Sequence, residues 1–162
     1  MKIKKTNAIR ILDDHKIPYS IKEYSFDEEH LDAIHVASEV RMPVEQIFKT
    51  ICIRGDKSGI FFACIPGSKK INLKAIAKLS ENKKAELVHV KELFELTGYI
   101  RGGCSPLGAK KKYPVFLDES AKDWNEIAIS AGKRGIQILL NSKDLINISN
   151  GMYGKITFSE KK

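Results

Sequence analysis

The sequence predicts an α+β fold organised around a mixed, partly closed sheet. Many short apolar runs of the kind that form strands recur along the chain, and segments with helical apolar spacing stand between them. Strands and helices do not alternate regularly, which argues against a doubly wound parallel sheet. The chain has 162 residues, 43% of them hydrophobic, and shows no repeat or linker, so we expect residues 1–162 to form a single domain with a sizeable core.

Helical and strand-like segments follow one another in the first half of the chain. Ala8, Ile9 and Leu12 have helical spacing, and a Lys-Ile-Pro sequence ending at Pro18 interrupts the pattern. Two β-branched runs separated by the glycine-bounded segment 55–59 predict a hairpin. Asn72 is a residue of the type that caps a helix N-terminus. We therefore expect helices at 7–15, 31–40 and 72–79, and strands at 19–24, 48–54 and 60–65.

The second half of the chain holds shorter elements. A helix over 90–96 is expected to end at Gly98, because glycine readily adopts the left-handed backbone that terminates a helix. Further on, apolar runs predict strands at 114–117, 126–130 and 136–140, a helical turn at 142–146 and a last strand at 155–158. Four acidic residues crowd one stretch, and their spread suits a solvated turn better than a carboxylate pair. They are Asp118, Glu119, Asp123 and Glu126.

The charge of the chain points to an acidic partner. The formal net charge is +8, and no basic amphipathic helix with exposed aromatic residues is evident, so nucleic acid is a better candidate than a membrane. Basic residues cluster at the ends of the expected elements, where loops can gather them on one rim, although such residues also solvate ordinary surfaces. The clusters are Lys69-Lys70, Lys83-Lys84, Lys110 to Lys112 and Lys133-Arg134.

The apolar runs and the cysteines indicate the cellular compartment of the protein. The longest apolar runs, such as 60–65, are too short to span a bilayer, and the basic start at residues 1–5 is not followed by a signal-type apolar segment, so we expect a cytoplasmic protein. Three cysteines form no CxxC pair, and their odd number argues against a disulfide framework. Cys52 and Cys64 lie in apolar runs and are expected in the core.

A glycine-rich loop is the most distinctive segment. It reads Gly98-Tyr-Ile-Arg-Gly-Gly-Cys-Ser-Pro-Leu-Gly108 and is followed by Lys110, Lys111 and Lys112. Glycines let backbone N–H groups approach a ligand without a Cβ in the way, and the lysines add positive charge nearby. The loop therefore suits an anion or carbonyl cradle, or more simply a tight connection between a helix and a strand.

Lys49 stands out because both faces of its expected strand are apolar. Side chains alternate along a strand, so Lys49 shares one face with Ile47, Ile51 and Ile53. The other face carries Phe48, Thr50 and Cys52. A lysine in such a run either reaches solvent from the end of the strand or lies in a pocket where an anionic or carbonyl group offsets its desolvation. Both interpretations stay open on the residues alone.

No standard catalytic or metal motif competes with these features. The histidines are scattered, and the five-residue offset between His30 and His35 does not place two ligands on one helical face, so we expect His35 at the surface or half buried and no metal site. The chain has no GxSxG elbow, Walker loop or dinucleotide fingerprint. An enzyme of this kind lacks an obvious nucleophile and must rely on positioning and electrostatics.

Four motifs together resemble the YbaK/EbsC family of aminoacyl-tRNA deacylases. They are Phe48-Lys49-Thr50, Asn72-Leu-Lys74, the glycine-rich loop with Lys110-Lys111, and Gly132-Lys-Arg-Gly135. The resemblance runs from about residue 7 to residue 148 and is closest to the branch that hydrolyses cysteinyl-tRNA(Pro), which is related to the editing domain of prolyl-tRNA synthetases. It implies a largely antiparallel, barrel-like sheet surrounded by helices, with no metal and no cofactor.

The resemblance also implies roles for particular residues. Lys49 matches a functional lysine that orients the aminoacyl-adenosine end, and Gly102 matches a glycine whose backbone lies against the scissile ester. Substrate-binding positions are implied at Tyr24, Gly103, Ser105 and Pro106. The basic residues expected to hold tRNA are Lys110, Lys111, Lys112, Lys133 and Arg134.

Two residues depart from the family pattern. Gln137 stands where some relatives have an acidic residue, which puts a carboxylate role there in doubt. Cys104 stands where isoleucine is common, and we expect it to pack in the loop because no histidine is placed to activate its thiol.

The function implied by the resemblance is editing in trans of cysteinyl-tRNA(Pro). The substrate's own thiol would attack its ester carbonyl and expel the tRNA, so the protein needs no nucleophile. Partners implied are the mischarged tRNA and, secondarily, prolyl-tRNA synthetase. The alternatives are a deacylase for alanyl- or seryl-tRNA, and a non-catalytic module that binds tRNA.

Overall fold

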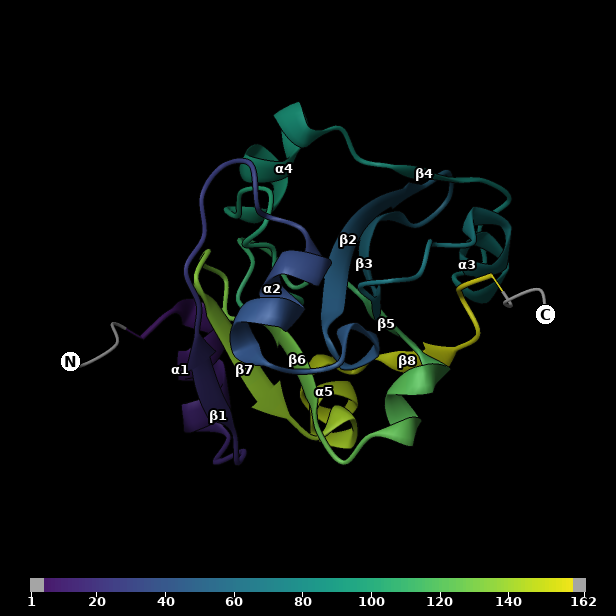
Figure 1. The fold of residues 1–162 in the computed structure, drawn as a ribbon. Coiled ribbons are helices and arrows are strands. Elements are labelled where there is room, and N and C mark those ends of the chain that lie inside the picture. Colours follow the sequence, from purple (N-terminus) through teal and green to yellow (C-terminus); the bar gives the residue numbers. More distant parts are fainter. Residues whose placement is uncertain (1–4, 159–162) are drawn as a thin grey trace.

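The computed structural model describes residues 5–158, so the basic start of the chain lies outside the described residues except for Lys5. The described part contains five α-helices, two short 3₁₀ helices and eight strands arranged in two sheets (Figure 1). This arrangement confirms the α+β class predicted from the sequence. No helix of the described part is long and apolar enough to cross a membrane.

The larger sheet has five strands in the order β4-β2-β3-β5-β8. β2 and β3 form the predicted antiparallel hairpin, and their register places Lys49 opposite Ile65, near the open end of the hairpin. β4 is antiparallel to β2, whereas β5 and β8 continue the sheet in parallel. The strands are β2 (Phe48–Gly55), β3 (Gly59–Pro66), β4 (Ala85–Leu87), β5 (Val115–Asp118) and β8 (Met152–Gly154).

The smaller sheet is antiparallel and has the order β1-β7-β6. Its strands are β1 (Ser20–Glu23), β6 (Ile127–Ser130) and β7 (Ile136–Leu140). A parallel bridge between Ile47 and Ala128 connects the start of β2 to β6. The described strands therefore form two linked sheets, mostly antiparallel, rather than one continuous barrel.

Helices lie around the two sheets, with α4 at the top of Figure 1, α5 at the bottom and α2 in front of the junction between the sheets. Side-chain caps fix several of their starts: the Asn72 side chain accepts a hydrogen bond from the N–H of Ala75 (3.1 Å), as its sequence position predicts. α4 ends at Gly98 in the left-handed region (φ 82°), also as predicted. The helices are α1 (Asn7–Asp14), α2 (Ala33–Val40), α3 (Leu73–Leu79), α4 (Val90–Thr97) and α5 (Ser142–Ser149), with 3₁₀ helices η1 (Val44–Gln46) and η2 (Glu119–Asp123).

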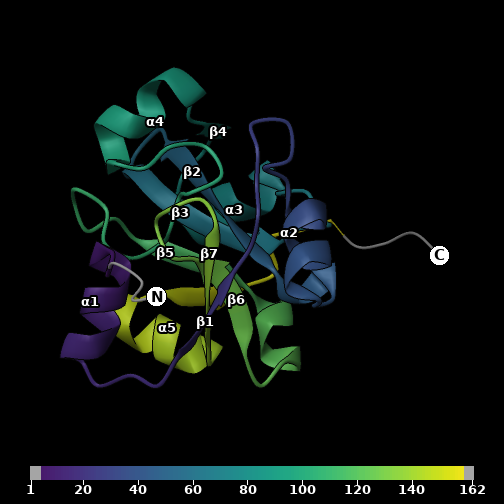
Figure 2. The same ribbon diagram turned by 60° about the vertical axis from the view of Figure 1, so that its left-hand side comes forward.

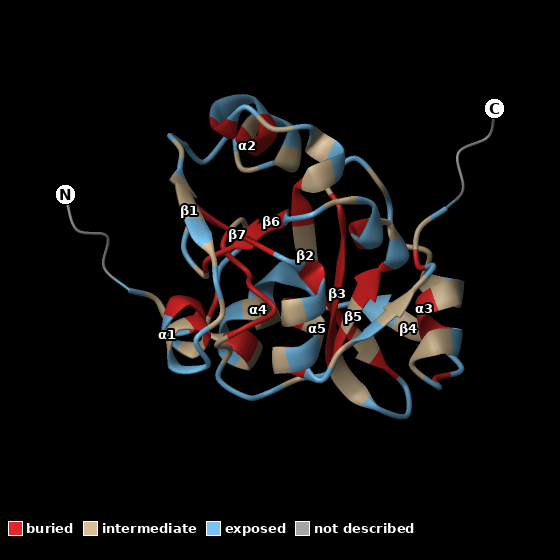
Figure 3. Ribbon diagram, turned by 90° about the horizontal axis from the view of Figure 1, so that it is seen from below, coloured by how far each residue is buried: buried red, intermediate tan, exposed pale blue. Residues whose placement is uncertain are grey.

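The core follows the central strands. Every residue of β6 and β7 is buried, as is most of β3, and Figure 3 shows these strands in red at the centre of the molecule. Cys52 and Cys64 are buried free thiols, as the sequence predicts. A strand that is buried on both faces and hydrogen bonded on both edges is rigid, so β7 gives a fixed base for any side chain it presents to a site.

Two predictions near the C-terminus are wrong. The last strand is Met152–Gly154 rather than 155–158, and within 155–158 there is an isolated bridge between Thr157 and Ile71. Asp118, expected in a solvated turn, is buried, with 3% of its surface exposed. The two errors meet at one contact, because the buried Asp118 carboxylate accepts hydrogen bonds from the Ile156 N–H (3.1 Å) and the Thr157 hydroxyl (3.3 Å) of the segment expected to form the last strand.

The structure also has elements that the sequence did not predict. β4 is three residues long, too short for a periodic pattern, and α5 continues to Ser149 beyond the single turn expected from the sequence. β4 is also flanked by the charged sequence Lys83-Lys84 and contains Glu86, which hides its strand character.

Replacing Asp118 with alanine should lower the free energy of unfolding by about 2–3 kcal/mol, because buried donors lose a charged acceptor. Asp123→Ala, an exposed change in the same stretch, is the matched control and should stay within about 0.5 kcal/mol of wild type. Urea unfolding of the three proteins measures the difference. Equal stabilities for the two variants would contradict a structural role for Asp118.

Candidate active site

A cavity of about 290 Å³ opens where the two sheets, helix α2 and the glycine-rich loop meet. It is bordered by the start of β2, the end of β6, the start of β7, and the residue that follows β1. Its volume is at the low end for ligand sites, which suits a small chemical group better than a whole nucleotide. The lining includes Tyr24, Asp32, Lys49, Thr50, Arg101, Gly102, Cys104, Ser130 and Gln137.

Lys49 reaches this cavity from the open end of the β2–β3 hairpin. Its side chain is half buried, and Nζ donates a hydrogen bond to the Gly67 carbonyl (3.2 Å), which uses one of its three protons. Burial lowers the pKa of the Lys49 ammonium, and the positive charge of Lys70 lowers it further. No carboxylate of the described residues forms an ion pair with Lys49. The ammonium therefore has protons left to donate to a ligand in the cavity.

The glycine-rich loop contributes unpaired backbone donors. Gly102 has a positive φ of 84°, and the N–H groups of Gly102 and Cys104 donate no hydrogen bond to another described residue. Both residues line the cavity. Two open amides beside a lysine make a donor set suited to a carbonyl oxygen that gains negative charge.

The second glycine segment packs directly against this loop. A Cβ added at Gly103 would lie 3.3 Å from the backbone nitrogen of Arg134, and Arg134 Nε donates to the Arg101 carbonyl (2.8 Å). Figure 2 shows the β6–β7 turn beside the loop that follows α4. The two glycine motifs seen in the sequence therefore form one structural unit, in which the close approach of the Arg134 backbone favours glycine at position 103.

Tyr24 lies directly after β1 and lines the same cavity as Lys49 and Gly102. Its backbone N–H donates to the Gly135 carbonyl (2.9 Å), which ties it to the second glycine segment. Its ring meets Phe26 edge to face, with centroids 6.4 Å apart. Tyr24, Lys49 and Gly102, three of the predicted site residues, therefore line one cavity although they lie far apart in the sequence.

Gly103, Ser105 and Pro106, the other predicted substrate-binding residues, do not line this cavity. Ser105 is fully buried, and its hydroxyl accepts a hydrogen bond from the Leu107 N–H (3.3 Å). Pro106 lines a separate hollow together with Lys111 and Lys112. These residues shape the loop, and their binding role stays a prediction.

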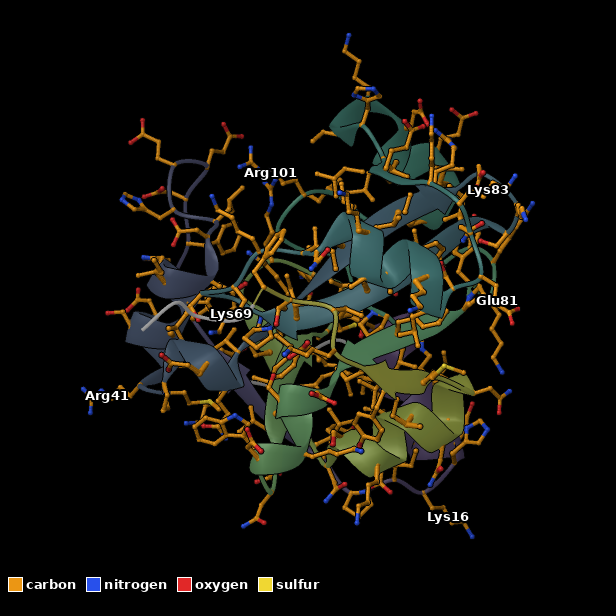
Figure 4. The ribbon with its side chains drawn as sticks, turned by 90° about the vertical axis from the view of Figure 1, so that its right-hand side faces the viewer. Lys16, Arg41, Lys69, Glu81, Lys83 and Arg101 are labelled. Carbon is orange, nitrogen blue, oxygen red and sulfur yellow. The ribbon has the colours of Figure 1, made fainter. Side chains whose placement is uncertain are left out.

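The predicted tRNA-binding residues fall into two groups. Lys133 and Arg134 line a neighbouring hollow that shares Tyr24 with the cavity, and Arg134 donates to the Arg101 carbonyl of the loop. Lys110 instead extends over the Phe94 ring (5.1 Å to the centroid) and donates to the Glu95 carbonyl (3.3 Å). Lys111 and Lys112 line the separate hollow that contains Pro106. Figure 4 places Arg101 and Lys69 toward the α2 side of the molecule, whereas Lys83 and Glu81 lie at the opposite side.

Cys104 is a buried loop residue without an activating partner. Burial raises the pKa of its thiol, and no histidine lines the cavity or bonds to Cys104 among the described residues. A thiol with a raised pKa is a poor nucleophile at neutral pH. The structure thus agrees with the packing role expected for Cys104.

His30 and His35 come closer than their spacing indicates. His30 precedes α2, so the helical offset does not separate the rings, whose centroids lie 5.2 Å apart. His35 is half buried, as expected, and its Nε2 contacts the Ser25 carbonyl (2.9 Å). No group of three potential ligands in the described part of the chain is arranged to hold a metal ion.

Sequence reasoning missed four polar residues of the cavity. Arg101 lies inside the glycine-rich loop without a role predicted for it, and Ser130 ends a strand whose other residues are apolar. Thr50 follows Lys49 on β2, and Asp32 caps the start of α2. A polar residue that ends a fully buried strand is a signal that could have identified Ser130.

Comparison with known proteins identifies the family. A family model described as the aminoacyl-tRNA editing domain matches residues 27–148. The chain belongs to this family. The matched segment contains Lys49, Gly102 and Gln137, while Tyr24 lies just before it. Membership confirms the family resemblance seen in the sequence and the enzyme class that it implied, an aminoacyl-tRNA deacylase.

Relatives of the editing-domain family match by sequence. A protein of Enterococcus faecalis, EbsC, named as a candidate Cys-tRNA(Pro)/Cys-tRNA(Cys) deacylase, is 46% identical over 156 residues, which cover 96% of this chain and 95% of EbsC. A proline–tRNA ligase of Lactobacillus johnsonii is 26% identical over 102 residues, which cover 63% of this chain and 18% of the ligase.

Solved structures share the fold. A structure described as a candidate trans-editing enzyme for prolyl tRNA synthetase superposes with a TM-score of 0.80 at 21% identity and covers 96% of this chain and 100% of its own. A protein described as hypothetical gives a TM-score of 0.86 at 16% identity, covering 94% and 100%. At these identities the likeness shows that the editing-domain family fold extends over nearly the whole chain.

Proposed function

We propose that the protein is a trans-editing hydrolase that removes cysteine from mischarged Cys-tRNA(Pro). Support comes from the 46% identity to EbsC over nearly the full length of both proteins, and from the family of the chain. Editing of this kind is needed because a synthetase pocket for proline cannot strongly reject a similarly sized amino acid by packing alone. We propose the cytoplasm as its location, because aminoacyl-tRNA is a substrate of translation.

One observation carries the proposal: the cavity joins a lysine and two open amides but holds no activated nucleophile. Lys49, Gly102 and Cys104 supply donors for the ester carbonyl, whereas the Cys104 thiol is kept protonated by burial. Such a site can stabilise a tetrahedral intermediate but cannot form one with its own side chains. The attacking group must then come from the substrate or from water.

The substrate's own cysteine thiol meets this need. Its sulfur attacks the ester carbonyl carbon, the bond from that carbon to the ribose oxygen breaks, and the thiol proton passes to the ribose hydroxyl. The products are free tRNA and a cyclic thioester of cysteine, which water later opens. In this scheme Lys49 orients the aminoacyl end, and the Gly102 amide is available to the developing oxyanion.

A deacylation assay with cysteinyl-, alanyl-, seryl- and prolyl-tRNA(Pro) tests the function. We expect rapid release of cysteine, much slower release of alanine and serine, and no release of the cognate proline. Fastest release of alanine or serine would assign the protein to another small amino acid. Binding of tRNA(Pro) without any turnover would make it a non-catalytic module.

The position of the basic residues suggests how tRNA approaches. We propose that Arg101, Lys133 and Arg134 contact the phosphates next to the aminoacyl end, since Arg101 lines the cavity and the other two lie on the glycine segment that packs against its loop. Lys110, Lys111 and Lys112 lie further from the cavity and would contact the body of the tRNA. Prolyl-tRNA synthetase is proposed as a second partner, because this chain is similar to a segment of a proline–tRNA ligase.

Salt dependence separates the two basic groups. Replacing Arg101, Lys133 and Arg134 with alanine should make the plot of log affinity against log salt shallower by about 0.7–0.9 for each phosphate that the protein no longer neutralises. The triple change at Lys110 to Lys112 should reduce the slope less. Filter binding of tRNA(Pro) between low and moderate salt measures both slopes. An unchanged slope in the first variant would place the acceptor end elsewhere.

A further inference from the structure

A buried oxygen without a partner lies in the lining of the cavity. Gln137 is 5% exposed, and its side-chain Oε1 has no hydrogen-bond partner among the described residues. The same residue lines the cavity with Lys49 and Gly102. A buried acceptor left unpaired destabilises a fold, so its retention beside a cavity indicates that a ligand donates to it.

The backbone holds Gln137 in place. It lies on β7, the middle strand of its sheet, where its partners are Lys22 on β1 and Ser130 on β6. The Ser130 hydroxyl accepts a hydrogen bond from the Gly132 N–H (3.1 Å), which fixes the turn beside Gln137. A side chain on a strand with pairing on both edges is well placed to position a small group accurately.

The chemistry of an aminoacyl ester limits what can pair with this oxygen. The ester's oxygens accept hydrogen bonds and match Lys49 and the loop amides, so they cannot pair with a carbonyl oxygen. The α-ammonium group is the strong donor of an aminoacyl end, whereas a thiol is a weak donor. Its positive charge is also repelled by the Lys49 ammonium, which favours an acceptor away from Lys49. The cavity lining also contains the Asp32 carboxylate, but its Oδ1 already accepts a hydrogen bond from the His35 N–H (2.8 Å) at the start of α2, whereas Gln137 Oε1 has no partner among the described residues.

We propose that Gln137 is a positioning residue that holds the α-ammonium group of the aminoacyl ester through its side-chain oxygen. The inference rests on the proposed function, because it takes an aminoacyl-tRNA as the ligand. Holding the ammonium fixes the Cα of the amino acid, while Lys49 and the Gly102 loop hold the ester. The side chain of the amino acid is then confined to a single direction relative to the carbonyl.

The test compares two non-hydrolysable adenosine analogues that carry an amide in place of the ester. One bears a cysteinyl group and the other a 3-mercaptopropionyl group, which lacks only the ammonium. Wild type should bind the first at least about tenfold more tightly, the effect of one charge-assisted hydrogen bond. That preference should vanish in Gln137→Met, which keeps the length of the side chain but removes the acceptor. It should be kept in Gln137→Glu.

Gln46→Met is the matched control. Gln46 lies on η1, and its side chain already donates to the Glu126 carbonyl (2.9 Å) outside the cavity, so its replacement should leave the preference unchanged. Urea unfolding should show Gln137→Met at least as stable as wild type, because the change removes an unpaired buried oxygen. If Gln137→Met is unstable, Gln137→Glu decides the assignment. It should keep the preference for the analogue with the ammonium, and loss of that preference would contradict the role of Gln137.

A preference that persists in Gln137→Met, or is absent in wild type, would overturn the assignment. The deacylation assay reports separately on the proposed function. Lack of turnover on Cys-tRNA(Pro), with an ammonium preference that depends on Gln137, would sink the hydrolase proposal and leave the role of Gln137 standing.

Discussion

Lys49→Ala is expected to abolish deacylation of Cys-tRNA(Pro) while leaving the protein folded. The Lys49 ammonium lines the cavity and has protons free for a ligand, so its loss removes a charged donor from the ester. Removal of one well-placed donor of this kind costs about 100- to 1,000-fold in turnover. Single-turnover assays with saturating protein measure the loss without confusing it with weaker binding.

Stability should change little, because the half-buried ammonium is partly desolvated and has no ion pair to lose among the described residues. Lys49→Met keeps the apolar part of the side chain and should be folded and inactive in the same way. Lys83→Ala is the control, since Figure 4 shows Lys83 away from α2, the helix beside the cavity. Wild-type turnover by a folded Lys49→Met protein would exclude Lys49 from the mechanism.

Local sequence was sufficient to predict the elements that carry Lys49 and Gly102. A lysine in an apolar strand and four glycines in one short loop are anomalies that can be seen within about ten residues of the chain. The register of the β2–β3 hairpin then places Lys49 at the open end, beside Gly67. These features depend on residues that are close together in the sequence, so local sequence patterns are sufficient to predict them.

The remainder of the site depends on contacts between distant segments. Gln137 belongs to a run that reads as an ordinary buried strand, and only its pairing with β1 and β6 places it in the cavity beside Lys49. Lys110 could not be placed from its sequence either, because its position follows from contacts with Phe94 and Glu95 on α4. The burial of Asp118 likewise depends on a contact between distant segments, because its carboxylate accepts from the Ile156 N–H, 38 residues further along the chain.

The identity of the nucleophile is decided by exchanging thiols on the protein and on the substrate. Cys104→Ile should keep activity on Cys-tRNA(Pro), because the reacting sulfur belongs to the substrate and burial raises the pKa of the Cys104 thiol. Isoleucine is larger than cysteine and can strain a packed loop, so Cys104→Ala serves as a second variant. Circular dichroism of both variants establishes that they are folded.

The substrate side of the exchange should have the opposite result. Seryl-tRNA(Pro) has nearly the shape of the cysteinyl substrate, but wild type should release serine more slowly by about a hundredfold or more, because a thiol is a few per cent thiolate at pH 7 whereas a hydroxyl stays protonated. Acid-quenched time courses on the two substrates measure the ratio. A folded Cys104→Ala protein that is inactive, together with equal rates on the two substrates in wild type, would require a protein thiol as nucleophile. Activity in both Cys104 variants with a large cysteine preference is the result expected when the nucleophile belongs to the substrate.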